Sequence, residues 1–263
     1  NDIKHLVSST QEGIHFYHAI FLLFHNKNDT LFLEKKNLLL QDKDTSLGDD
    51  FKRPLLDYMM NYCLIRRQDG IKDMGRHYVE ILQHLMYRNK LTDFGVITRG
   101  RFKNIIALSL EQGDVPFAES FLSTYRKRVN NQIKNTVVKY AEGLIFFHKE
   151  EYDYVIESIH SMELPSDDFL KVNVDILLMQ VFYLQKKYNS FEIKRKGLLQ
   201  MLKKNNRIGD RIMKSYQDFI SYILLAKNAR YDNKKDKVQI LIQEIKKAKP
   251  FHAKTWLLGT LEI

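Results

Sequence analysis

The sequence is poor in residues that cross-link or interrupt a chain. It has one cysteine, four prolines and eleven glycines among 263 residues. A single cysteine excludes an internal disulfide and a zinc site built from cysteines. So few prolines and glycines favour long helices over many short strands. The most continuous apolar run, residues 19–24, is far shorter than the roughly 20 residues that span a bilayer. We therefore expect no membrane span and a cytoplasmic location.

Catalytic motifs are missing as well. No phosphate-binding glycine loop, dinucleotide-binding glycine pattern, nucleophile elbow or HExxH string occurs. His15 and His18 have helical spacing but lack the further ligands that a metal site needs. Cys63 lies in an apolar run, which is typical of a small buried residue. We therefore predict a protein that is not an enzyme and has no cofactor and no metal site. A helical enzyme whose site leaves no motif stays open as a weaker alternative.

Helical periodicity is what the sequence does show. Helical runs at 5–25 and 31–41 precede a polar stretch at 42–50. The next helix is expected to begin near Pro54, with the proline in its first turn. The first helices of the pairs that follow are apolar around most of their circumference, as in 174–184, which indicates burial between neighbours. The predicted pairs are 55–67 with 71–88, 102–111 with 115–129, 133–148 with a helix ending at 162, 169–187 with 190–203, and 212–227 with 236–247, before a last run at 251–263.

Three short strings look like copies of one turn. They are Glu151-Tyr152-Asp153, Lys187-Tyr188-Asn189 and Arg230-Tyr231-Asp232. Their tyrosines are 36 and 43 residues apart, and a period of roughly 20–50 residues is the signature of stacked repeats. Turns at Gly70 and Gly113 fall into the same phase. Stacked arrays are usually binding surfaces, so the repetition favours a binding protein.

The helix pairs resemble tetratricopeptide-type repeats, most closely over residues 141–156. Gly143 matches the small position where helices cross closely, Phe146 the aromatic packing position and Tyr152 the aromatic residue of the turn. The family's Trp-Leu-Gly pattern is absent, and the resemblance covers about residues 51–247. It implies an all-α, right-handed α-solenoid of about five antiparallel helix pairs in a repeat array at 51–263, preceded by an N-terminal helical segment at 1–50.

Asn61 and Asn104 each lie nine residues before a turn glycine, Gly70 or Gly113, so they occupy the same place in consecutive first helices. In the resembled family, asparagines on these helices clamp an extended peptide in the concave groove. An amide suits this task because it both donates and accepts hydrogen bonds. The resemblance thus implies a protein or peptide partner held by these two residues. The alternative is that each asparagine caps or bridges a neighbouring turn.

The positive charge is concentrated near the C-terminus. The net charge is +10, and residues 186–254 hold 19 Lys and Arg against 6 Asp and Glu. Such asymmetry favours an anionic partner: a nucleic acid, an acidic peptide or a membrane surface. The candidate residues around an expected helix junction at 205–210 are Lys196, Lys203, Lys204, Arg207, Arg211 and Lys214. Nucleic-acid binding by residues 186–254, which we call the basic quarter, is the alternative function. The charge excess would also be explained by a solvated face that keeps the protein soluble.

Overall fold

The computed structural model describes residues 2–41, 49–88, 90–91, 95–129, 134–163, 168–205, 207–231 and 235–262. These residues form thirteen α-helices and one short 3-10 helix, and the only bridge of extended backbone among them joins Ile97 to Val129. The predicted all-α fold is therefore confirmed. No helix in the described ranges is long and apolar enough to cross a membrane.

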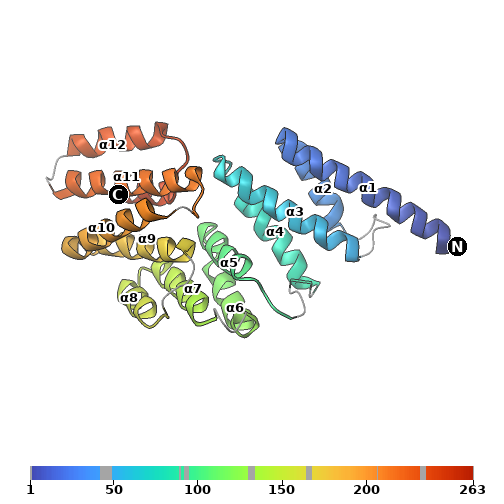
Figure 1. Ribbon diagram of the computed structural model, residues 1–263, viewed down its shortest axis with the longest axis horizontal. Coiled ribbons are helices and arrows are strands. Elements are labelled where there is room, and N and C mark those ends of the chain that lie inside the picture. Colours follow the sequence, from blue (N-terminus) through green and yellow to red (C-terminus); the bar gives the residue numbers. More distant parts are fainter. Residues whose placement is uncertain are drawn as a thin grey trace. The chain divides into compact units, whose positions relative to one another are not determined.

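The chain divides into two compact units, Asn1–Asn130 and Asn131–Ile263, which we call the first and second units. The first unit contains α1 (Asp2–Asn26), α2 (Asp29–Leu40), α3 (Asp49–Gln68), α4 (Met74–Tyr87), α5 (Arg99–Glu111), α6 (Val115–Tyr125) and η1 (Arg126–Arg128) (Figure 1). The second contains α7 (Lys134–His148), α8 (Tyr152–His160), α9 (Asp168–Leu184), α10 (Tyr188–Lys204), α11 (Asp210–Tyr231), α12 (Lys235–Lys247) and α13 (Lys254–Glu262). The predicted boundary at residue 50 stays a prediction, because residues 42–48 lie outside the described ranges.

The expected start of a helix near Pro54 is wrong by more than one turn. Helix α3 begins at Asp49, so Pro54 lies inside it. Proline has no amide hydrogen and cannot donate to the carbonyl four residues earlier. That carbonyl belongs to Asp50, at the beginning of α3, so the lost bond falls in the first turn of hydrogen bonds.

Three turns between consecutive helices share one backbone geometry. The second residue after the first helix is left-handed in each, with φ 79° at Gly113, 61° at Glu150 and 56° at Lys186. The next residue has ψ between 63° and 65° in all three, namely Asp114, Glu151 and Lys187. Its amide donates to a carbonyl five residues earlier, which satisfies an otherwise free group at the helix end. The structure thus repeats one turn at intervals of 37 and 36 residues.

The tyrosine strings match this turn in two places and not in the third. Tyr152 and Tyr188 are the first residues of α8 and α10, as the predicted equivalence requires. Tyr231 is instead the last residue of α11, and Asp232 lies outside the described residues. The third copy is therefore wrong, because the 22-residue α11 continues through the position where the turn was expected. The Tyr231 ring meets the edge of the Tyr188 ring, with centroids 6.1 Å apart.

Gly143, the expected small position of α7, lies against two neighbouring helices at ordinary contact distances. A Cβ atom on this residue of α7 would lie 3.4 Å from Ile159 Cδ1 of α8 and 3.5 Å from Leu177 Cδ2 of α9. Helix α9 is buried around most of its circumference, as predicted from 174–184, whereas α12 buries one side through Leu241, Ile242 and Ile245. Consecutive helices pack on one another within each unit, so each buries its apolar surface against its neighbours.

Candidate interaction surfaces

The six basic candidates surround the junction of α10 and α11, as the sequence predicted. Lys196, Lys203 and Lys204 lie on α10, Arg207 lies between the helices, and Arg211 and Lys214 lie on α11. All six are exposed. Two are engaged by carboxylates, since Arg207 lies 3.9 Å from Asp168 and Lys214 lies 2.6 Å from Asp218.

Three cations remain open in this region. Lys196, Lys203 and Lys204 are exposed and form no ion pair with any residue that the structure describes. Their neighbour Ile193 on the same helix is 72% exposed. Tyr216, on the first turns of α11, is buried and is therefore not exposed for base stacking. The open surface of α10 therefore combines positive charge with an aliphatic side chain.

Asn61 and Asn104 occupy different environments. Asn61 is exposed on α3. Asn104 on α5 is half-buried and its side chain hydrogen-bonds Tyr78 of α4. The amide of Asn104 thus contributes to packing within the first unit, while that of Asn61 faces solvent. A shared role as a peptide clamp stays a prediction.

Asn61 lies among large apolar side chains that are exposed. We call Ile14, Tyr17 and Phe21 of α1, with Tyr58, Asn61 and Ile65 of α3, the aromatic face. The exposed fractions of its apolar members are 63% for Ile14, 41% for Tyr17, 64% for Phe21, 45% for Tyr58 and 38% for Ile65. Helix α1 packs on α3, and the rings of Tyr17 and Tyr58 meet edge to face at 6.2 Å. Spacings of three and four residues place the remaining members on the same side of each helix.

The equivalent positions in α7 and α9 are covered. Asn61 and Ile65 lie nine and five residues before the left-handed Gly70. Counting back in the same way from Glu150 and Lys186 gives Ala141, Ile145, Leu177 and Val181. These four are at most 4% exposed. The surface that α3 leaves open is thus one that α7 and α9 use for packing.

The aromatic face carries almost no fixed charge. Between Gly13 and Asn26 the chain has no Lys, Arg, Asp or Glu, and its only titratable groups are tyrosine and histidine side chains. The ring of His25 stacks on Phe21 at 5.9 Å with 6° between the planes. On α3, the nearest carboxylate in sequence to Tyr58 is Asp57, which accepts a hydrogen bond from Arg101 at 2.6 Å. The face is therefore suited to apolar partners.

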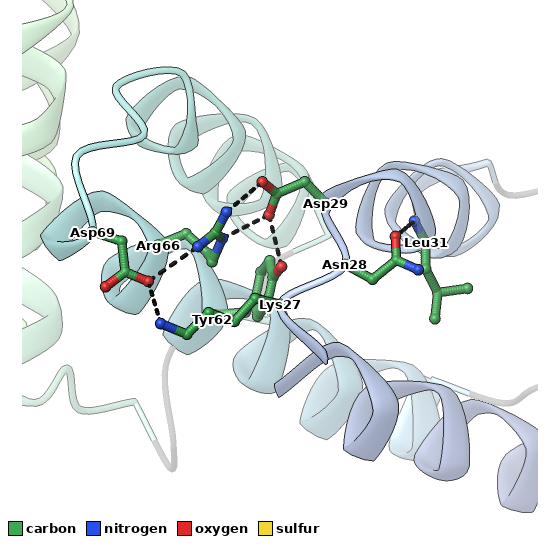
Figure 2. A network of polar contacts seen from close by, with 7 residues as sticks. All are labelled: Lys27, Asn28, Asp29, Leu31, Tyr62, Arg66 and Asp69. Atoms are coloured by element: carbon green, nitrogen blue, oxygen red, sulfur yellow. Dashed lines mark hydrogen bonds and ion pairs between the residues drawn. The ribbon is translucent and has the colours of Figure 1, made fainter. Parts of the chain in front are cut away.

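A polar network fixes the two helices that carry this face (Figure 2). Asp29, at the start of α2, accepts hydrogen bonds from Arg66 Nε and Nη2 of α3 at 2.8 and 2.7 Å and from the Tyr62 hydroxyl at 2.7 Å. Arg66 also donates to Asp69, which receives a further bond from Lys27 at 2.9 Å. The turn between α1 and α2 is thereby tied to the end of α3.

The network changes the acidity of its members. Hydrogen bonds from Arg66 hold the pKa of Asp29 below its ordinary value. Burial, with the bond to Asp29, raises the pKa of Tyr62 above the ordinary value. The two-pronged pairing with Asp29 raises the pKa of Arg66. All three groups therefore keep one protonation state through the neutral range, as a structural connection requires.

A second cluster of ionisable side chains joins α2 to α4. Lys36 of α2 is 5% exposed, donates to Glu80 of α4 and lies 3.1 Å from His77 Nδ1. Burial opposes ionisation of Glu80, but its bonds to Lys36 and His77 bring its pKa below the ordinary value. Burial raises the pKa of Cys63 to about 12, so this thiol is not a nucleophile at neutral pH. Lys36 is thus the buried member of a structural ion pair.

One hollow in the first unit is too small for a typical ligand. A hollow lined by His15, Phe16, Lys35 and Leu38 has a volume of about 100 Å³, whereas ligand pockets measure roughly 300–1,000 Å³. Within the described ranges, no group of three or more His, Cys, Asp and Glu side chains is placed to hold a metal ion.

Comparisons with protein-family models, with curated proteins and with solved structures gave no match to this chain.

Proposed function

We propose that this protein is a non-catalytic, tetratricopeptide-like interaction module that binds an apolar segment of a protein partner on its aromatic face. The observation that carries the proposal is the exposure of five large apolar side chains on two adjacent helices around Asn61. Contiguous exposed apolar patches mark interaction sites, whereas single scattered apolar side chains on a surface are ordinary. The amide of Asn61 would bond the partner's backbone while the rings of Tyr17, Phe21 and Tyr58 bury its side chains.

The architecture that we propose is a right-handed α-solenoid of about five helix pairs, α3–α4 to α11–α12, with α1 and α2 as an N-terminal addition. The shared turn geometry after α5, α7 and α9 supports repetition. A related turn joins α1 to α2, where Lys27 is left-handed with φ 50° and Asn28 caps α2. This relation supports an addition that is built like the repeats and packs on the first pair.

The test combines photo-crosslinking with exposed-residue variants. A photoreactive phenylalanine analogue at position 61 should crosslink a protein from the native cell, and the same analogue at Tyr87 should not. Tyr87 is a matched control because it is aromatic, 85% exposed and in the same unit. Burial of each ring on binding should contribute about 2 kcal/mol, so Phe21→Ser with Tyr58→Ser should weaken capture of that protein at least thirtyfold. Tyr87→Ser should leave capture unchanged.

Equal crosslinking from positions 61 and 87, or capture that survives loss of both rings, would contradict the proposal. Capture is measured with and without nuclease.

The open Lys196, Lys203 and Lys204 favour nucleic-acid binding as the second candidate function. Retention that disappears on nuclease treatment and falls steeply with salt would support this second function instead.

A further inference from the structure

The only tryptophan of the chain connects its last helix to three others. Trp256 of α13 contacts Phe147 of α7, Tyr183 of α9 and Phe219 of α11, with ring centroids 6.1, 6.2 and 6.3 Å apart. We call these three rings the Trp256 site. Phe147 and Tyr183 each lie three residues before a left-handed turn residue and are therefore equivalent positions of the repeated turn.

This placement differs from ordinary stacking of one helix on its predecessor. Helix α13 packs on α12 and α11, as the next member of a stack would. Its tryptophan, however, also contacts residues near the ends of α7 and α9. Helix α9 begins the helix pair before α11, and α7 begins the pair before that. The helix thus lies across the ends of successive first helices, where it covers a shared aromatic surface.

The contacts of α13 combine an apolar side with polar connections at its C-terminal end. Leu257 and Leu261 are buried. At the C-terminal end, Arg230 donates to the Thr260 carbonyl and Lys246 pairs with Glu262 at 2.8 Å. These two cations belong to the basic quarter of the chain. The surface therefore fits a short helix that has one large ring in its first turn, an apolar side and a negative charge at its C-terminal end.

The surface beneath α13 contains a buried polar group that lacks a hydrogen-bond partner among the described residues. The Tyr183 hydroxyl is buried and has no hydrogen-bond partner among the described residues, an arrangement that burial penalises. The guanidinium of Arg230 lies over the Tyr183 ring at 5.4 Å. Helix α13 has only nine residues, and helices of this length are unstable unless they are packed against another surface. Its order therefore depends on the contacts that it makes here.

We propose that the Trp256 site is a second interaction surface, and that α13 is a built-in occupant that a helix of the same chemistry displaces. The partner helix is amphipathic, carries one large aromatic residue and ends in an acidic residue, as α13 does with Trp256 and Glu262. Because α13 is tethered, it competes at an effective concentration of about a millimolar. A partner must therefore exceed α13 in affinity or in concentration.

The probe is a fluorescently labelled peptide with the sequence of residues 249–262. The full chain with Trp256→Ala should bind it at least tenfold more tightly than the wild-type chain, because the tethered competitor has lost its anchor. Adding Phe147→Ala should remove that gain. Tyr154→Ala is the matched control, because Tyr154 is an aromatic residue of the same unit that is 56% exposed and lies outside the Trp256 site. A peptide carrying alanine for tryptophan should not bind.

Hydrogen exchange on the wild-type chain provides a readout that needs no variant. Amides of α13 should exchange faster than those of α11 and α12, and excess unlabelled peptide should accelerate them further. The proposal is overturned if α13 exchanges only together with α11 and α12, if Trp256→Ala binds the peptide no better than wild type, or if Phe147→Ala has no effect. The aromatic face lies on other helices, so failure of this test and failure of the proposed function are separate results.

Discussion

Replacing Arg66 by methionine tests the polar network that holds α1 and α2 against α3. The substitution keeps the aliphatic part of the side chain but removes two bonds to Asp29 and one to Asp69. The Arg66 side chain is 13% exposed and that of Asp29 is 34% exposed. The pair therefore lies between an exposed ion pair, worth up to about 1 kcal/mol, and a fully buried one, whose disruption costs about 3–5 kcal/mol.

We expect a loss of about 2 kcal/mol in the free energy of unfolding of the first unit. For a unit of this size that loss corresponds to a melting temperature lower by about 6–10 °C. Arg67→Met is the matched control on the adjacent residue. Its partner is Glu111, and the two side chains are 36% and 43% exposed. Its cost should stay below about 1 kcal/mol.

Thermal unfolding followed by circular dichroism measures both variants, and hydrogen exchange assigns the change to α1–α3. The pH dependence provides a second check. The pKa of Asp29 is lowered in the folded chain, so its contribution is present above the unfolded pKa of about 3.9 and is lost as the pH falls through the lower folded pKa. The difference between wild type and Arg66→Met should therefore narrow in this acidic range. Equal costs for the two variants at neutral pH would refute the reasoning.

Two further predictions concern single buried positions. The thiol of Cys63 should react with a disulfide reagent at neutral pH only as fast as the first unit opens, because burial raises its pKa to about 12; reaction rates in water and in denaturant check this, and rapid labelling of the native chain would contradict it. At Gly143 a Cβ would meet Ile159 and Leu177 at ordinary contact distances, so Gly143→Ala should stabilise by up to about 1 kcal/mol. Gly143→Leu should overpack the crossing and destabilise by about 1–3 kcal/mol. Denaturant melts distinguish these results, and a stable leucine variant would show that α7 does not pack as described.

Helix positions could be predicted because apolar periodicity depends on local spacing alone. The predicted runs 102–111, 133–148 and 236–247 lie within one to three residues of α5, α7 and α12 at each end. Left-handed turn residues are harder to predict from the sequence than helices are. Gly113 marks its turn by composition, but Glu150 and Lys186 adopt the same backbone region without being glycine. At Tyr231 the sequence resembles the other two tyrosine turns, but the backbone is still helical.

The two interaction surfaces could not be predicted, because exposure depends on what packs over a helix. The apolar run of α1 is too short to span a membrane, and its Ile14, Tyr17 and Phe21 recur at helical spacing. A stripe of that kind normally faces a core, and only packing shows that this one remains open. Contacts of Trp256 with Phe147 join residues more than a hundred positions apart, which spacing cannot indicate.

The basic quarter illustrates how packing divides a charge excess among different tasks. Lys194 pairs with Asp175, while Arg195 and Lys227 both pair with Glu192. These cations connect α9, α10 and α11 and hold carboxylates that would otherwise lose hydration without compensation.

Other cations of the same quarter hold the last helix, since Arg230 and Lys246 bind its C-terminal end. Of the sequence-predicted patch, Lys196, Lys203 and Lys204 remain open. Three phosphate contacts would give a salt dependence of about −2.7 in log K against log salt, which is shallow for a nucleic-acid-binding protein. A positively charged rim beside an aromatic site, by contrast, needs only one or two cations to orient a helix with an acidic end. We therefore propose that the cations beside the Trp256 site serve recognition of a protein segment, and that the three open lysines on α10 alone would bind a phosphate backbone weakly.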